Sequence, residues 1–99
     1  MAQVEVRIFH PISYQMTGEH RGLVLKKEIE PGMSLESFLV LMQETDSPVW
    51  KTIWNREARI SGEDIIIIFQ GKVLNNKTIC STSLNEGDTI MIRKMFHGG

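Results

Sequence analysis

The last two residues of the chain, Gly98 and Gly99, are the pair whose type and position best suit chemistry. The reactive group would be the carboxylate of Gly99. Because glycine has no Cβ, a backbone built from it approaches a nucleotide or a nucleophile closely and adopts conformations that other residues avoid. At an average glycine usage of about 7%, two terminal glycines arise by chance in about one chain in 200. The pair alone is therefore only suggestive.

Other residue types capable of chemistry do not form a recognisable site. Gly71-Lys72 lacks the upstream glycine spacing of a Walker phosphate loop, so any ATP chemistry would belong to a partner. His10, His20 and His97 are scattered, show no metal-ligand spacing and are interpreted as surface residues. Cys80 has no nearby histidine or acid pattern and is interpreted as a half-buried structural thiol. We therefore expect no metal, no cofactor and no enzymatic activity.

Length and composition indicate one globular domain. Ninety-nine residues suffice for one domain and are too few for two, and the 41% hydrophobic and 23% charged content is ordinary. A net charge of −1 gives no basic footprint for nucleic acid. The longest apolar run, residues 65–69, is far shorter than the roughly 20 residues of a membrane span. A single cysteine and an N-terminus without a signal-like pattern favour the cytoplasm.

The elements that would position the C-terminus begin with two predicted strands. Apolar and polar residues alternate over residues 4–9 with the period of a half-buried strand, and Pro11 ends it because proline donates no ladder hydrogen bond. Residues 13–21 are polar, include Gly18 and predict a loop. Residues 22–29 predict the second strand.

A main helix is predicted after Ser34, which suits the N-cap, and Glu36 lies in the first turn, where the helix dipole favours a negative charge. The spacing of one buried helical face is followed by Leu35, Phe38, Leu39 and Met42. Ser47-Pro48 then begins a second, short helix. Its Trp50 and Trp54 are either a binding surface or a packed cluster at the sheet edge, and their size favours the cluster.

The C-terminal part predicts strands at 64–70, 73–74 and 89–93. Residues 75–77 are expected to form a loop, and residues 78–84 an irregular stretch or one helical turn. This ββαββ order, with an extra short helix before the third main strand, predicts an α+β domain with a helix on one face of a mixed sheet. We expect a β-grasp over residues 1–93 and a flexible tail over residues 94–99.

The C-terminal third resembles that of ubiquitin. The matching positions are residues 68–74, Thr78, Leu84, Thr89-Ile90 and Gly98-Gly99. Residues 84–90 also resemble the L-x-x-G-D-x-V turn of the small sulfur carriers, which serve molybdopterin, thiamine and thiolated-tRNA synthesis. Residues 48–64 look more like the small subunit of molybdopterin synthase than like ubiquitin. The chain departs from these families at Gln70, Arg93 and His97, where they carry other residues.

This resemblance implies a β-grasp whose terminal glycine is activated by a partner. Adenylation of the Gly99 carboxylate by a ubiquitin-activating-type adenylyltransferase would be followed by conversion to a thiocarboxylate. The expected destination is molybdopterin or the tungsten cofactor, ahead of thiamine and tRNA, with the large subunit of molybdopterin synthase as a second partner. The alternatives are a ubiquitin-like modifier joined through Gly99 to lysines, and a β-grasp binding module.

A partner surface is expected beside the tail. Alternation along residues 65–69 turns residues 65, 67 and 69 toward the helix and leaves the even-numbered ones on the outer face. Exposed apolar rows of this kind mark interfaces. The expected partner-binding residues are Ile66, Ile68, Met91, Met95, Phe96 and His97. The alternative is that the segment around Trp50 and Trp54 covers this face.

Overall fold

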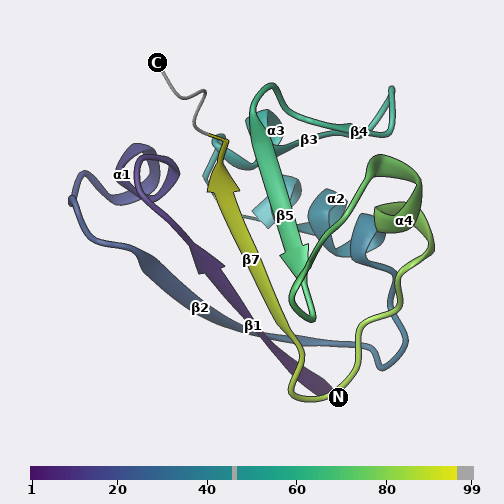
Figure 1. The fold of residues 1–99 in the computed structure, drawn as a ribbon. Helices are drawn as coiled ribbons and strands as arrows, with labels where there is room; N and C mark the ends of the chain where they lie inside the picture. Colours follow the sequence, from purple (N-terminus) through teal and green to yellow (C-terminus); the bar gives the residue numbers. More distant parts are fainter. Residues whose placement is uncertain (46, 96–99) are drawn as a thin grey trace.

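A five-stranded mixed sheet organises the structure, a computed structural model that describes residues 1–45 and 47–95. The strand order is β2-β1-β7-β5-β6. Its strands are β1 (Ala2–Ile8), β2 (Leu23–Ile29), β5 (Ile65–Phe69), β6 (Lys72–Val73) and β7 (Thr89–Lys94). The neighbouring strands β1 and β7 are parallel, whereas every other pair in this sheet is antiparallel (Figure 1).

Helices α2 and α3 pack on one face of this sheet (Figure 1). The helices are α1 (Ile12–Thr17), α2 (Leu35–Thr45), α3 (Trp50–Ile53) and α4 (Asn76–Ser81). A small hairpin follows α3 and consists of β3 (Trp54–Asn55) and β4 (Ile60–Ser61). The predicted α+β, β-grasp architecture is confirmed, including the extra short helix before the third main strand.

The predicted buried face of the main helix is confirmed. Ser34 Oγ accepts a hydrogen bond from the Ser37 backbone N–H at 3.0 Å, as an N-cap does. The four predicted side chains and the sheet residues of the same core are at most 2% exposed: Leu35, Phe38, Leu39, Met42, Val6, Ile67, Ile90 and Ile92. Removing this apolar area from water is the main source of stability.

Both tryptophans belong to that core. Trp50 and Trp54 are 1% and 0% exposed, and the Trp50 ring meets Phe38 edge to face at 6.5 Å. The packed-cluster interpretation is confirmed. The idea that this segment covers the outer sheet face is wrong, because its large side chains are buried on the helix side.

The loop prediction for residues 13–21 is wrong over its first part, where the chain forms α1. Ile12 and Ser13 are both buried, and the Ser13 hydroxyl donates to the Arg21 carbonyl at 3.0 Å. Gly18, with φ of 76°, ends the helix in the left-handed conformation that glycine tolerates. Only Ile12 and the partly buried Met16 pack this helix on the core, which is too few residues for the sequence to show a helical period.

The predicted loop at residues 75–77 is also partly wrong, because Asn76 begins α4. Asn75 Oδ1 accepts the Thr78 N–H at 2.8 Å and caps this helix, while Ile79, 1% exposed, anchors it. At the other end of the fold, β7 runs one residue further than predicted, to Lys94.

An ion pair joins α2 to the β3–β4 hairpin. Arg59, at φ of 58°, donates from Nε and Nη2 to the two carboxylate oxygens of Glu36, each at 2.8 Å. These hydrogen bonds hold the pKa of Glu36 below its ordinary value, because they favour the charged carboxylate.

The stability contribution of this pair should therefore be present above the ordinary glutamate pKa and be lost as pH falls through the lowered folded-state pKa. In Arg59→Ala, the Glu36 pKa should rise and the acid-induced loss of stability should shrink. NMR titration of the side-chain carboxyl and unfolding at neutral and acidic pH measure both effects. Arg56→Ala, whose arginine pairs with Glu44 at 3.6 Å, is the matched control. An ordinary Glu36 pKa in the wild type would contradict the assignment.

Candidate partner-binding surface

Five directly opposed residues cross the whole sheet on the face turned away from α2. The strand registers place Val24 opposite Arg7, Arg7 beside Met91, Met91 opposite Ile68, and Ile68 opposite Val73. Side chains on paired positions of neighbouring strands share a face and contact each other. The sheet thus builds a continuous row from its β2 edge to its β6 edge.

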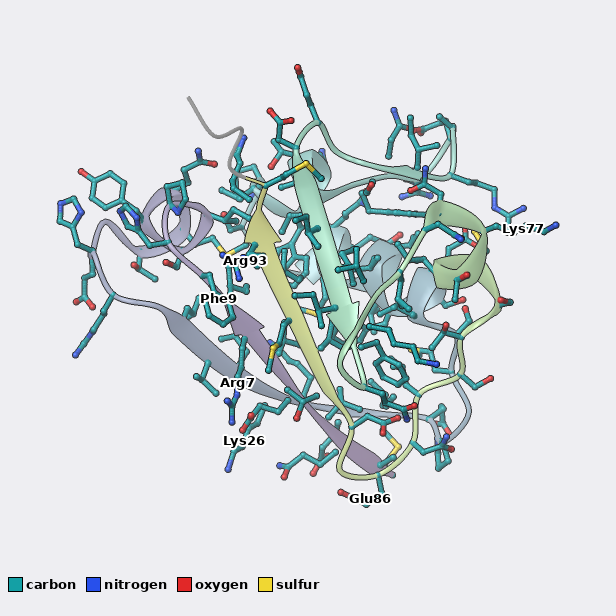
Figure 2. All side chains as sticks on the ribbon, in the orientation of Figure 1. Arg7, Phe9, Lys26, Lys77, Glu86 and Arg93 are labelled. Carbon is teal, nitrogen blue, oxygen red and sulfur yellow. The ribbon has the colours of Figure 1, made fainter. Side chains whose placement is uncertain are left out.

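A second, shorter row lies beside the first. Ile66 is opposite Arg93, and the Arg93 guanidinium lies 5.8 Å from the centre of the Phe9 ring, a cation–π distance. Figure 2 shows Arg93 and Phe9 next to each other near the ends of β7 and β1. The Phe9 N–H donates to the Ile92 carbonyl at 2.9 Å, which fixes this residue to the central strand.

We name the apolar members of both rows the outer apolar face. They are Phe9, Val24, Ile66, Ile68, Val73 and Met91. Ile66, Ile68 and Met91 are partly exposed, whereas Phe9, Val24 and Val73 are 39%, 56% and 66% exposed. The alternation predicted for β5 is confirmed, because Ile67 and Phe69 are buried against the core and Ile65 packs on it.

Sequence reasoning missed half of this face. Phe9 lies beyond the end of β1, and Val73 belongs to a strand of only two residues. Val24 stands between two apolar neighbours, so alternation was hidden there. Only the cross-strand register, which a single sequence does not contain, joins these residues to Ile68 and Met91.

Two shallow depressions lie on the outer apolar face. One, of about 280 Å³, is lined by Ile68, Met91 and the turn around Gly87. The other, of about 220 Å³, is lined by Arg7, Phe9 and Val24. Each would accept a side chain from a partner, which is how buried anchors contribute to binding.

Charge is distributed unevenly around the face. Arg7, Lys26 and Arg93 are exposed on it, and Arg7 Nε lies 2.7 Å from Glu5 Oε2 (Figure 2). At the opposite end of the sheet, Glu86 accepts a hydrogen bond from the Gln3 N–H at 3.1 Å. Glu5 and Glu28 lie on the same side of β1 and β2 as Arg7 and Lys26, so the face combines an apolar row with charges of both signs on these two strands.

The predicted tail is described only at its start. Lys94 ends β7, and the Met95 N–H donates to the Asp64 carbonyl at 2.7 Å, with Met95 47% exposed. Phe96, His97, Gly98 and Gly99, which carry the remaining predictions for the tail, lie outside the described residues. Met95 continues directly from the strand that carries Met91 and Arg93.

The remaining candidates of the sequence are placed as follows. Cys80 is partly buried, as expected. His10 and His20 are exposed but not scattered, because their rings meet with ring nitrogens 3.3 Å apart.

Over residues 1–45 and 47–95, no three His, Cys, Asp or Glu side chains are grouped to hold a metal ion. Nor is any helix in that part of the chain long and apolar enough to cross a membrane.

Solved structures similar to this chain share its fold across nearly its whole length. Small archaeal modifier protein 1 from Haloferax volcanii superposes with a TM-score of 0.70 at 11% identity, covering 99% of this chain and all of the other. A second structure of that protein gives 0.69 at 10% identity. The putative molybdopterin converting factor subunit 1 from Pyrococcus furiosus gives 0.67 at 14% identity, covering 97% of this chain and all of the other.

No family model matches this sequence, and no curated protein matches it either. At 10 to 14% identity, the structural similarities establish the fold, a ubiquitin-like β-grasp. This is the fold that the element order and the C-terminal motifs predicted.

Proposed function

We propose that this protein is a small sulfur carrier whose Gly99 carboxylate is activated by a ubiquitin-activating-type adenylyltransferase and converted to a thiocarboxylate. One observation carries the proposal: the central strand of a β-grasp, β7, leads within a few residues to Gly98-Gly99. Two of the structures that share the fold are named as a small archaeal modifier protein and as a putative molybdopterin converting factor subunit.

The proposed reaction requires no catalytic residue from this chain. The Gly99 carboxylate attacks the α-phosphate of ATP, which forms an acyl-adenylate and releases pyrophosphate. Hydrosulfide then attacks the acyl carbon. The bond from that carbon to the AMP oxygen breaks, and AMP leaves with its electron pair. The product is a C-terminal thiocarboxylate that donates its sulfur to an acceptor. Glycine suits this role because both ATP and the sulfur nucleophile must approach the backbone closely.

Molybdopterin, or the related tungsten cofactor, is the proposed destination of the sulfur, with thiamine next. The segment between the main helix and the third main strand supports this choice, because it resembles the molybdopterin-synthase type. The large subunit of that synthase is then a second partner. Binding to the activating enzyme and binding to the large subunit are both proposed to occur in the cytoplasm.

Mass spectrometry of the protein purified from its native host tests the proposal. Exchange of one terminal oxygen for sulfur is the expected result. Larger conjugates that are cut back to Gly99 would instead support a modifier joined to lysines, the second candidate, which the name of the Haloferax structure favours. Unmodified protein that functions normally without Gly99 would refute both.

We further propose that the outer apolar face binds the activating enzyme, with Met95, Phe96 and His97 extending the contact. Ile68 lies within the apolar part of the row, opposite both Met91 and Val73. A glutamate there would place a charge among apolar groups of both proteins, which costs free energy on burial.

Ile68→Glu should weaken binding of the activating enzyme at least about tenfold, or about 1.4 kcal/mol, while the protein stays folded. Calorimetric titration against the enzyme measures the affinity. Ile60→Glu is the matched control, because Ile60 is 45% exposed on the β3–β4 hairpin, away from this face. A folded Ile68→Glu variant with wild-type affinity would contradict the assignment of the face.

A further inference from the structure

Three aromatic rings meet where β1 gives way to α1. The His10 Nε2 and His20 Nδ1 atoms lie 3.3 Å apart. Tyr14 stacks on the His20 ring, with centroids 4.6 Å apart and the planes at 25°, and approaches His10 edge-on at 6.1 Å. All three residues are exposed, so solvent and dissolved ions reach the two facing nitrogens.

The fold holds the two histidines in this arrangement. Phe9, next to His10, is tied to β7 by its backbone N–H. On the other side, the Gly18 N–H donates to the Tyr14 carbonyl at 2.8 Å, and the buried Ser13 hydroxyl donates to the Arg21 carbonyl. Helix α1 therefore fixes the loop that carries His20 at two points, on both sides of that residue. Little chain entropy is left to lose when a ligand bridges the rings.

We propose that His10 Nε2 and His20 Nδ1 chelate a divalent transition-metal ion of the Zn²⁺, Ni²⁺ or Cu²⁺ class. Metal–nitrogen bonds of about 2.0–2.1 Å, drawn to two nitrogens at the observed separation, enclose an angle of roughly 105–110°, near the tetrahedral value. Rotation about χ2, a broad torsion, turns the ring lone pairs toward a shared ion. Water fills the other coordination positions.

The proton balance of this step is simple. An N–H···N hydrogen bond between the facing atoms requires a tautomer in which one of them carries a proton. On metal binding, that proton moves to the far nitrogen of the same ring, and both facing nitrogens bind the ion as neutral imidazole. Imidazole favours borderline transition metals, whereas Mg²⁺ prefers oxygen ligands. The site thus selects by ligand type, and it does not depend on the proposed function.

Titration of the full chain tests the assignment. Zn²⁺ should bind with one-to-one stoichiometry in calorimetry, and Mg²⁺ should give no heat of binding. His10→Ala and His20→Ala should each weaken Zn²⁺ binding at least about tenfold, since even outer partners of metal ligands are worth 10- to 100-fold in affinity. Cys80→Ser removes the single thiol and should leave the affinity unchanged.

A measurement on the unaltered protein keeps the test independent of how the variants fold. Substoichiometric Cu²⁺ should broaden the imidazole NMR signals of His10 and His20 first, together with the ring signals of Tyr14. Broadening that begins at His97 or around Cys80 would overturn the assignment. So would Zn²⁺ affinity that is equal in the wild type and in a folded variant lacking both His10 and His20.

Discussion

Deletion of Gly99 should abolish charging of this protein by its activating enzyme and leave the fold intact. The new terminal carboxylate, on Gly98, would stop short of the nucleotide by one residue, or about 3.5 Å. Because a misplacement of about 1 Å costs on the order of 100-fold in rate, we expect a loss of more than about 1,000-fold. The last strand ends at Lys94, so the sheet keeps all its pairs.

ATP–pyrophosphate exchange with the activating enzyme from the native host measures this loss directly. A variant with one alanine appended after Gly99 is the matched control for length, and it should fail equally because its carboxylate is displaced the other way. Wild-type exchange by either variant would refute the role of the Gly99 carboxylate. That result would not test the outer apolar face, because calorimetry measures binding of the enzyme independently of the exchange reaction.

Among the glycines that the structure describes, Gly62 is the one at which alanine should be most destabilising. A Cβ at this position would lie 1.7 Å from the Thr52 carbonyl oxygen and 2.9 Å from its carbon, so the backbone must move. The Gly62 N–H also donates to the Ile53 carbonyl at 2.8 Å, next to a side chain that is 0% exposed. Overpacking that displaces backbone typically costs about 1–3 kcal/mol, and the closeness of this contact places Gly62→Ala near about 3 kcal/mol.

The measurement is urea-induced unfolding, in which a loss of this size lowers the midpoint at nearly constant slope. Gly22→Ala is the matched control, because its Cβ would meet the Ile8 carbonyl oxygen at 3.4 Å, close to ordinary contact. We expect that change to alter the free energy of unfolding by no more than about 1 kcal/mol. Equal effects at both glycines would show that the Thr52 contact is relieved without cost.

The main helix and the main strands were predictable because their apolar residues follow a recognisable pattern along the sequence. The helix from Leu35 shows the spacing of one buried face, and the strand ending at Phe69 shows a continuous apolar run. Ser34 marked the helix start by its chemistry, and the structure confirms the cap. The order of these elements was enough to predict the β-grasp.

Short elements held by tertiary contacts were not predictable. Helix α1 depends on the packing of Ile12 and Met16 and on one hydrogen bond from Ser13. Helix α4 depends on the Asn75 cap and on Ile79. Neither helix is long enough to show a period.

The candidate site was predictable only where alternation within a strand shows it. Ile66 and Ile68 follow from alternation in β5 and Met91 from alternation in β7, but Phe9 joins them through pairing of segments that are distant in sequence. The meeting of His10 with His20 depends in the same way on α1, which the sequence did not reveal.

The parallel pairing of β1 with β7 has a consequence for folding kinetics. Glu5 pairs with Thr89, so the centre of the sheet closes only after nearly the whole chain has been synthesised. Contacts between such distant segments slow folding, because the chain entropy is lost before the pairing is gained. A ribosome-bound or truncated chain without β7 exposes the unpaired edges of β1 and β5, which invite aggregation.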